Sequence, residues 1–321
     1  MHCPAVSICN NSRVPGAATE TRAVAAVVVT YNRTALLDQC LVAIENQTHR
    51  PDLIIVVDNA SDDGTAEYLA ERVWGIDRRV ITLPRNYGGA MGFAVGMAAA
   101  LATDADSVWL MDDDAIPTAS ALEYLLEDTK VATRGGRRPA FACSMVVWSD
   151  GTVARMNVPR ANAVWNQAAA RIGRAVVDVD SASFVSALIP ADHIRAVGLP
   201  HIGYFKWYDD TEYTLRLRRA YGPGICSMNS VVKHLSANNE GALPWQATDY
   251  NAADHARALR NRVNASLTLS DVRGFLSVSR DALMTATAPS QPLRRKGRLL
   301  KGYLSGFTYR PPVLPAETTR D

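Results

Sequence analysis

Long apolar runs, paired cysteines and a large net charge are all missing from this 321-residue chain. No hydrophobic stretch approaches the roughly 20 residues that a membrane-spanning helix requires. The five cysteines are scattered without a close CxxC pair, which argues against a disulfide scaffold or a zinc site and indicates reduced thiols. A net charge of +2 is too small for a general attraction to nucleic acid. Residues 1–22 lack the basic start and long apolar centre of a secretory signal, so we expect a flexible tail there.

The remaining composition, 48% hydrophobic and 21% charged residues, is that of an ordinary soluble enzyme. Short apolar runs alternate with segments whose apolar residues recur at helical spacing, and they predict strands at 24–30, 53–57, 80–83 and 108–111 and helices at 35–46, 66–72 and 90–101. This alternation predicts an α/β fold with a Rossmann-like, mostly parallel, doubly wound sheet and helices on both faces. Its ligand site is expected at the loops that follow the strands.

The most informative segment is Met111–Asp114, where three carboxylates directly follow an apolar strand. Three adjacent anions repel one another and cannot share a dry core, so we expect a cation to hold them together. Mg²⁺ or Mn²⁺ bound to a nucleotide pyrophosphate fits best, because these ions take carboxylate and phosphate oxygens in one octahedral shell. The alternative is a solvated acidic turn, which suffices for one aspartate but less well for three.

Five segments carry a resemblance to a known family: Val-Thr-Tyr-Asn-Arg at 29–33, Val-Asp-Asn-Ala-Ser-Asp-Asp-Gly-Thr at 57–65, Arg-Asn-Tyr-Gly-Gly-Ala-Met-Gly-Phe at 85–93, Met-Asp-Asp-Asp at 111–114, and Lys-Trp-Tyr-Asp-Asp-Thr-Glu-Tyr at 206–213. The chain resembles the family 2 glycosyltransferases of the GT-A fold. Within that family it is most similar to actinobacterial galactofuranosyltransferases of cell-wall galactan synthesis.

The resemblance runs from about Val24 to His234 and implies a division of the chain. We expect a GT-A domain over 23–245, with a nucleotide-binding half at 23–115 and an acceptor-binding half at 116–245. A helical, basic C-terminal region then covers 246–321.

Donor contacts are expected where the early strands end. The Asp58 carboxylate can accept hydrogen bonds from uracil or ribose, and the resemblance assigns it the base, with a turn cap as the alternative. Arg85, Asn86 and the glycines after them offer a cation, an amide and open backbone at a helix start. By resemblance this loop cradles the donor sugar and pyrophosphate, while a tight turn is the alternative. The expected donor-binding residues are Thr30, Arg33, Asp58, Arg85, Asn86, Gly88, Gly89, Asp112 and Asp113.

By the same resemblance, Asp112, Asp114 and His234 bind a divalent metal, Mn²⁺ or Mg²⁺. The metal is expected to act as a Lewis acid that neutralises charge as the nucleoside diphosphate leaves. Imidazole is a competent ligand for Mn²⁺. For His234 the alternative is an ordinary surface or core histidine.

A second acidic cluster, Asp209 and Asp210, stands at the start of a helix predicted to end at Gly222. Acidic residues are favoured at a helix start without any catalysis. The match to the family's paired-acid motif implies that Asp210 is the general base and that Asp209 binds the acceptor hydroxyl. Trp207 and Glu212 are also expected on the acceptor side. Many family 2 enzymes carry Glu-Asp here, and the Asp-Asp of this chain is a departure that the galactofuranosyl group shares.

Between Ala282 and Ala316 the chain has six cations and no acidic residue, interleaved with leucines and aromatics. This pattern is expected for a helix that lies on an anionic membrane surface, and a solvated basic tail is an equal alternative. The six cations are Arg294, Arg295, Lys296, Arg298, Lys301 and Arg310.

These features together predict an inverting, metal-dependent enzyme that moves galactofuranose from UDP to a hydroxyl of a polyprenyl-diphosphate-linked glycan. The predicted location is the cytoplasm, peripheral to the inner face of the plasma membrane, with no nucleic-acid partner and with an oligomer allowed. Two rival functions stay open: a rhamnosyltransferase that uses a dTDP-sugar, and a catalytically silent nucleotide-binding protein on the same fold.

Overall fold

The computed structural model describes residues 23–134, 136–162, 175–241 and 243–316. The predicted N-terminal tail lies outside these residues. The strands are β1 (Val24–Thr30), β2 (Leu53–Asp58), β3 (Asp77–Thr82), β4 (Ser107–Asp112), β5 (Ala115–Pro117), β6 (Ala142–Trp148), β7 (Arg160–Ala161), β8 (Val176–Ser181), β9 (Ala187–Pro190) and β10 (Gly224–His234). The helices are α1 (Thr34–Glu45), α2 (Thr65–Glu71), α3 (Gly89–Leu101), α4 (Ala121–Arg134), α6 (Ala191–Val197), α7 (Asp209–Tyr221), α8 (Ala252–Thr268), α9 (Val272–Thr287) and α10 (Leu293–Ser305).

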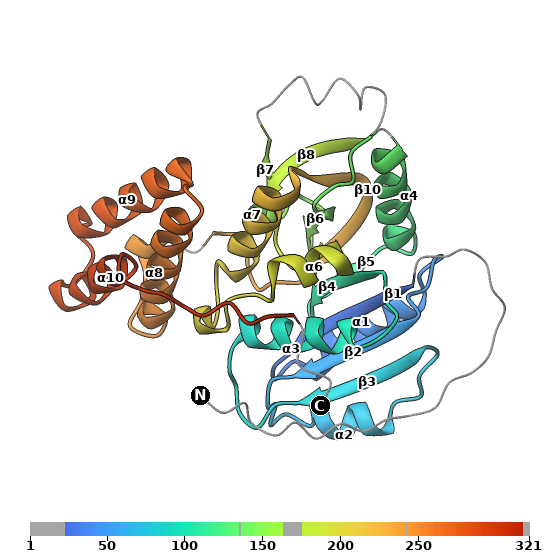
Figure 1. The fold of residues 1–321 in the computed structure, drawn as a ribbon. Helices are drawn as coiled ribbons and strands as arrows, with labels where there is room; N and C mark the ends of the chain where they lie inside the picture. Colours follow the sequence, from blue (N-terminus) through green and yellow to red (C-terminus); the bar gives the residue numbers. More distant parts are fainter. Residues whose placement is uncertain (1–22, 135, 163–174, 242, 317–321) are drawn as a thin grey trace.

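One mixed sheet forms the centre of the molecule, with the strand order β3-β2-β1-β4-β9-β6-β10-β8-β7 and with β5 paired to β10 (Figure 1). The first four strands along the chain pair in parallel, as their alternation with helices predicts. Strand β9 lies antiparallel between β4 and β6, so the second half of the sheet is mixed. The predicted α/β fold class is confirmed, and each predicted strand and helix before residue 112 is present.

The early strands end at the same edge of the sheet. Every side chain of β1 is buried, as expected for a parallel strand covered on both faces. In the register of the sheet Thr30 lies beside Asp58, and Val29 lies beside Asp112. The strand-end residues singled out in the sequence are therefore neighbours in space.

Helix α3 packs unusually close to this sheet because two of its residues lack side chains. A Cβ added to Gly92 would lie 2.5 Å from the Val29 side chain, and one added to Gly96 would lie 2.3 Å from Val27. Gly92 belongs to the glycine segment for which close approach of a ligand is predicted. The structure gives Gly92 a different purpose, which is helix-to-sheet packing.

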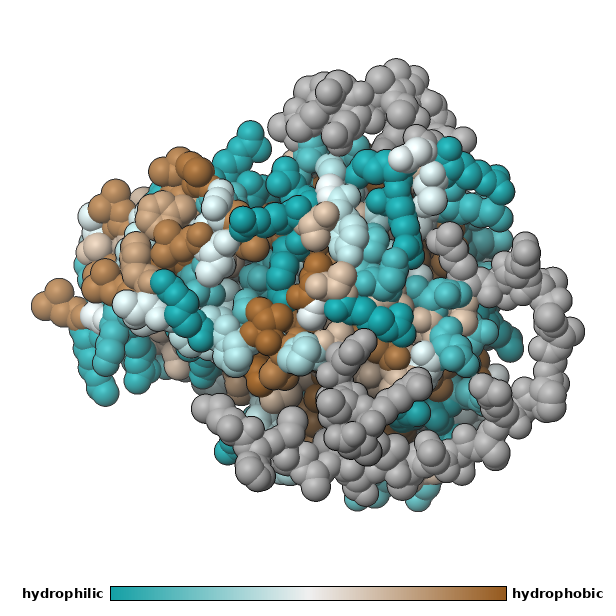
Figure 2. Space-filling model, in the orientation of Figure 1, coloured by the Kyte–Doolittle hydropathy of each residue, from teal (hydrophilic) through white to brown (hydrophobic). Residues whose placement is uncertain are grey.

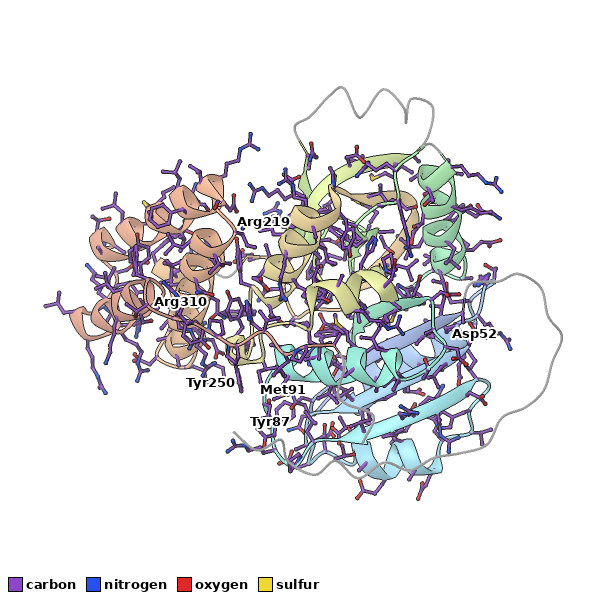
Figure 3. The ribbon with its side chains drawn as sticks, viewed as in Figure 1. Asp52, Tyr87, Met91, Arg219, Tyr250 and Arg310 are labelled. Atoms are coloured by element: carbon purple, nitrogen blue, oxygen red, sulfur yellow. The ribbon has the colours of Figure 1, made fainter. Side chains whose placement is uncertain are left out.

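Helices α8, α9 and α10 pack on one another beside the sheet and enclose a small core of their own, formed by Ala247, Leu259, Val263, Val278 and Leu299 (Figure 1). Arg219 of α7, labelled in Figure 3, donates to the Thr268 carbonyl at the end of α8 (3.0 Å). After α10 the chain runs back to the sheet domain, where the Leu314 carbonyl accepts from the Leu199 amide (2.9 Å). The C-terminal helices are therefore tied to the sheet domain by more than one segment.

Two further expectations concern the described residues. Cys40, Cys143 and Cys226 are buried and free, in agreement with reduced thiols. A helix long and apolar enough to cross a membrane is absent from the part of the chain that the structure describes.

Candidate active site

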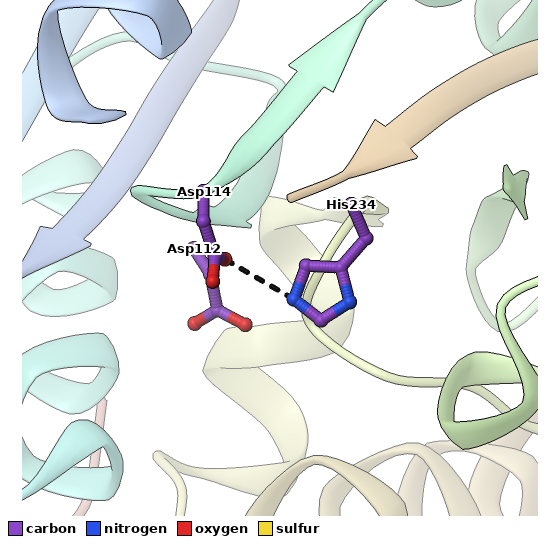
Figure 4. Close-up of side chains that lie close together, drawn as sticks. All are labelled: Asp112, Asp114 and His234. Carbon is purple, nitrogen blue, oxygen red and sulfur yellow. Dashed lines mark ion pairs between the residues drawn. The ribbon is translucent and has the colours of Figure 1, made fainter. Parts of the chain in front are cut away.

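Two carboxylates and one imidazole meet at the edge of the sheet where β4 and β10 end. The ligand atoms of Asp112, Asp114 and His234 all lie within 4.8 Å of one another (Figure 4). The antiparallel pairing of β5 with β10, which sets His234 opposite Ala115, brings the histidine to the acidic turn. His234 Nε2 lies 3.1 Å from the buried Asp114 Oδ1 atom.

Asn157 orients the histidine from behind. The Asn157 Oδ1 atom lies 2.8 Å from His234 Nδ1, and the Asn157 amide nitrogen donates to Ser183 Oγ (3.1 Å). An amide oxygen can only accept, so Nδ1 carries a proton and Nε2 is the ring nitrogen that faces the carboxylates. A histidine held in this way is prepared for a metal ion. Nothing in the sequence around Asn157 marks it as part of the site.

The charges of the three groups are strongly linked. Burial, reinforced by the charge of Asp114, raises the pKa of Asp112 to about 7. Burial alone would raise the pKa of Asp114, but the hydrogen bond and charge of His234 outweigh it and lower that pKa. Burial alone would lower the pKa of His234, and the Asp114 carboxylate raises it instead. Two carboxylates and a neutral imidazole form a donor set that fits Mn²⁺ or Mg²⁺.

Arg33 and Asp113 contact each other. The Arg33 guanidinium lies 3.2 Å from Asp113 Oδ1 and 2.7 Å from Asp114 Oδ2. The other Asp113 oxygen accepts from the Thr30 hydroxyl (2.8 Å) and the Tyr31 amide (3.4 Å). Both Asp113 oxygens therefore have protein donors that hold the turn, and the donor contact expected from the sequence stays a prediction. Arg33 is half-exposed and neutralises part of the acidic run.

Asp58 has one oxygen for each of its two expected roles. Its Oδ1 atom accepts from the Ser61 amide (3.0 Å) and the Ser61 hydroxyl (2.6 Å), and these two bonds cap the turn after β2. Its Oδ2 atom is buried, and no group in the described ranges forms a hydrogen bond with it. A buried oxygen without a donor is costly, so a ligand that supplies an N–H or O–H group is favoured at this position.

The glycine loop is closed by protein contacts rather than left open. Asn86 Oδ1 accepts from the Gly88 amide (2.8 Å), and the Phe205 carbonyl accepts from the Ala90 amide (3.2 Å). Gly88 has φ of +83°, and a Cβ there would lie 2.0 Å from the Phe205 carbonyl oxygen. These contacts favour the tight-turn alternative for Gly88, because its amide already has an acceptor and the space beside it is filled.

Gly89 and Arg85 stay available at this end of α3, which Tyr87 and Met91 mark in Figure 3. No described atom lies within 4 Å of a Cβ added to Gly89. Arg85 is exposed, and its guanidinium lies over the Tyr87 ring, 4.6 Å from the ring centre. These two positions can still face a ligand.

Asp209 and Asp210 begin α7, and their carboxylates interact electrostatically with Asp112 at the end of β4. Burial raises the pKa of both, and the charge of Asp210 raises the pKa of Asp209 further, well above its usual range. The charge of Asp210 also contributes to the raised pKa of Asp112. The structure therefore brings together two acidic clusters that lie far apart in the sequence.

The two residues expected on the acceptor side differ. Both Glu212 oxygens accept from the Arg216 guanidinium (3.0 and 2.9 Å), and the residue is 1% exposed. Glu212 thus forms a buried i,i+4 ion pair, a spacing visible in the sequence, and its expected contact with the acceptor stays a prediction. Trp207 is half-buried, and its ring packs edge-on against His255 (5.2 Å between ring centres).

A cavity of about 630 Å³ lies beside the end of β6. Trp148, which pairs with His234 in the sheet, forms one wall, and Arg155 lies in the same short turn as Asn157. The cavity combines an aromatic face with carboxylates and amides, and its other lining residues are Asp150, Thr152, Val153, Asn238, Asn239 and Glu240. Such a lining suits a sugar chain, whose ring faces stack on indole and whose hydroxyls form hydrogen bonds.

The profile of glycosyl transferase family 2 matches residues 25–136, which hold the strand ends described above. Galactofuranosyltransferase GlfT1 of Mycolicibacterium smegmatis is 34% identical over 221 residues, which is 65% of this chain and 70% of that protein. GlfT1 of Mycobacterium tuberculosis is 33% identical over 228 residues, covering 68% and 72%. The chain belongs to glycosyl transferase family 2. It is therefore a glycosyltransferase, and the metal cluster and the acidic pair lie where its strands end.

Solved structures support the fold independently. A crystal structure of GalNAc-T7 with UDP, GalNAc and Mn²⁺ matches with a TM-score of 0.61 at 14% identity, over 90% of this chain and 56% of that one. Residues 1–349 of S. aureus TarS match with a TM-score of 0.56 at 13% identity, over 88% and 80%. At such low identity the likeness shows a shared fold, here GT-A with the C-terminal region added.

Proposed function

We propose that this family 2 glycosyltransferase transfers galactofuranose from UDP-galactofuranose to a hydroxyl of a polyprenyl-diphosphate-linked glycan, with inversion. The observation that carries the proposal is the meeting of the cluster Asp112, Asp114 and His234 with the pair Asp209 and Asp210 at one sheet edge. The donor sugar rests on the two GlfT1 proteins, which match over most of the chain.

We assign the metal to Asp112, Asp114 and His234, with Mn²⁺ or Mg²⁺ as the ion. When bound, the ion neutralises charge on the departing nucleoside diphosphate. The chain itself prepares this position, because the buried Asp114 Oδ1 atom lies 3.1 Å from His234 Nε2 and Asn157 holds the other ring nitrogen. Mn²⁺ is also named with the GalNAc-T7 structure of the same fold.

We assign the nucleotide to Asp58, through its unpartnered Oδ2 atom, to the exposed Arg85 and to the partly buried Gly89. Asp210 is proposed as the general base that takes the proton of the acceptor hydroxyl, which attacks C1 from the face opposite UDP. Burial raises the pKa of Asp210, and this makes its carboxylate a stronger base. Burial raises the pKa of Asp209 well above its usual range and so favours its protonated form, which can bind the acceptor hydroxyl but cannot take its proton.

A dTDP-rhamnose transferase is the second candidate, supported by O-antigen chain rhamnosyltransferase RfbN of Salmonella typhimurium, which is 32% identical over 120 residues. That match spans 35% of this chain and 36% of that protein, about half the extent of the GlfT1 matches. Because the GlfT1 matches cover about twice as much of the chain, galactofuranose is favoured.

We also propose that the C-terminal helices rest on anionic lipid. The outer face of α9 and α10 exposes Leu276 (64%), Leu283 (63%) and Leu293 (85%), and Figure 2 shows hydrophobic residues gathered over these helices. Exposed cations of α10 stand beside them, and each contributes about 1 kcal/mol near an anionic surface. Arg295, one of the cations expected to face the lipid, instead forms an ion pair with Asp249 (2.9 Å).

The test of the membrane contact compares vesicles of phosphatidylglycerol with vesicles of phosphatidylcholine. Replacing Arg294, Lys296 and Arg298 by Gln should reduce co-sedimentation with the anionic vesicles at low salt, because the attraction is screened by ions. Replacing the paired Arg295 alone is the matched control and should have less effect. Equal binding of both variants and the unaltered protein would contradict the contact.

The transferase proposal is tested by measuring UDP binding by calorimetry, with and without Mn²⁺, and by measuring sugar transfer. Asp114→Ala should remove most metal-dependent affinity for UDP and abolish transfer, because a charged ligand is lost from the cluster. Asp62→Ala, which removes an exposed carboxylate near the same sheet edge, is the control and should leave both unchanged. Faster turnover of dTDP-rhamnose than of UDP-galactofuranose would overturn the donor assignment.

A further inference from the structure

The loop that leads into the acidic pair has a disfavoured backbone. Phe205, Trp207 and Tyr208 have φ of +66°, +68° and +74°, the left-handed region that bulky side chains rarely adopt. Such conformations persist only where the surrounding structure holds them. The next residue is Asp209, the first residue of α7. The position of the acidic pair therefore depends on whatever holds this loop.

The side chain of Asn261 on α8 holds the loop at two points. Its amide nitrogen donates to the Tyr204 carbonyl (3.1 Å) and to the Trp207 carbonyl (2.9 Å). Its oxygen accepts from the neighbouring Arg260 guanidinium (2.9 Å), so the orientation of the amide is determined. Asn261 is fully buried. One side chain thus closes the strained turn from end to end.

The rest of the loop is gripped by the same C-terminal region. Its contacts are Gly203 with Arg260 (2.8 Å) and Tyr309 (2.7 Å), Phe205 with the Arg257 guanidinium (4.6 Å to the ring centre), Lys206 with Asp254 (2.8 Å), and Trp207 with His255. Each residue from 203 to 207 therefore touches the helices that follow the sheet domain.

The opposite side of the loop contacts the donor loop. The Phe205 carbonyl accepts from the Ala90 amide (3.2 Å), and its oxygen fills the space beside Gly88. A shift of this carbonyl would move the start of α3 as well as the start of α7. A displacement of α8 can therefore be passed through residues 203–208 to the donor loop at the start of α3 and to the acidic pair at the start of α7.

We propose that Asn261 is a positioning residue for transfer. It fixes the strained turn, and through the turn it sets Asp209 and Asp210 against the donor loop. The C-terminal helices then complete the active site in addition to any contact with lipid. The inference rests on the proposed role of the acidic pair, although Asn261 itself is buried and touches no substrate.

The test replaces Asn261 by Leu, which keeps the size and removes both N–H donors. Asn264→Leu is the matched control, because Asn264 is also fully buried on α8 but bonds the Tyr204 hydroxyl and the Tyr309 carbonyl, leaving the 205–208 backbone untouched. Three quantities are measured for each variant: the melting temperature, kcat and KM for UDP-galactofuranose with a soluble acceptor, and hydrogen exchange at the Ala90 amide.

We expect Asn261→Leu to lower kcat by about 10- to 100-fold, because small displacements of reacting groups are that costly. KM should change less, and the Ala90 amide should exchange faster. Asn264→Leu should lower the melting temperature by a similar amount, while its kcat should stay within about 2-fold of that of the unaltered protein. Equal losses of kcat in the two variants would overturn the inference.

Ala90 exchange separates this inference from the proposed donor. If the unaltered protein does not turn over UDP-galactofuranose, the donor assignment fails, yet the exchange rate still reports on the loop without substrate. An exchange rate in Asn261→Leu no faster than in Asn264→Leu would overturn the positioning role in that case. If the Leu variant does not fold, Asn261→Ser, which retains a shorter donor, is compared with Asn264→Ser in the same way.

Discussion

Replacing Asn157 should weaken metal binding although this residue touches no metal. Its oxygen accepts from His234 Nδ1 at 2.8 Å, and both residues are buried, with 9% and 8% of their surface exposed. Asn157→Leu leaves the Nδ1–H group without an acceptor. The histidine can then move its proton to Nε2, where it points at Asp114 and competes with a metal ion.

The size of the effect follows from these contacts. A hydrogen bond of this kind contributes about 0.5–1.5 kcal/mol, and a buried donor left without a partner costs about 1–3 kcal/mol. Loss of a residue that orients a metal ligand typically lowers metal affinity by about 10- to 100-fold, or about 1.4–2.8 kcal/mol. We therefore expect Mn²⁺ affinity to fall by about 30-fold.

The assay is calorimetric titration of Mn²⁺ into the protein with UDP present. Asn157→Asp is the first control, since a carboxylate also accepts from Nδ1–H and should preserve affinity. Ser183→Ala is the second, because it removes only the partner of the Asn157 amide nitrogen (3.1 Å) and should change affinity by less than about 3-fold. Equal Mn²⁺ affinities for Asn157→Leu and Asn157→Asp would refute the orienting role.

Three further outcomes are expected. Asp210→Asn should keep metal-dependent UDP binding but lower kcat by about 100-fold or more, as removal of a general base does; near-normal kcat at saturating substrate would move the role to its neighbour. Gly88→Ala should lower the melting temperature, because its Cβ would lie 2.0 Å from the Phe205 carbonyl oxygen; an unchanged melting temperature would mean that the loop has room to shift. Burial alone would raise the pKa of Asp271, but the hydrogen bond from Arg160 outweighs it and lowers that pKa below 3.8. The ion pair therefore stabilises the fold above pH 3.8, and this stabilisation is lost as the pH falls through the lowered pKa. The difference in unfolding free energy between Arg160→Gln and the unaltered protein should therefore shrink on acidification below pH 4, and a constant difference would contradict the coupling.

The sequence was sufficient for the strands and helices up to residue 112 and for the acidic turn at their ends. Burial on both faces leaves a continuous apolar run, as in β1, and parallel strands all end at one edge of the sheet. Local pattern therefore placed Asp58 and Asp112 at the same edge of the sheet, on either side of β1. Helix α7 also began and ended where its apolar spacing and Gly222 predict.

Local pattern does not show which partner a side chain has in the folded protein. Glu212 forms an ion pair with Arg216, and the sequence analysis did not use their visible i,i+4 spacing. Gly88 is a glycine because the Phe205 carbonyl lies against it, more than a hundred positions along the chain. The sequence of a glycine loop does not show whether a ligand or another part of the backbone occupies the space beside each glycine.

Tertiary structure alone decided which residues support the site. Asn157 reaches His234 because strands β5, β6 and β10 are adjacent, and Asn261 reaches Trp207 because α8 packs against the loop before α7. Hydrogen bonds between residues far apart in the chain depend on how layers pack, and no local periodicity encodes them. The sequence determined which carboxylates could do the chemistry, while the packing of distant segments decided which of them are held ready for it.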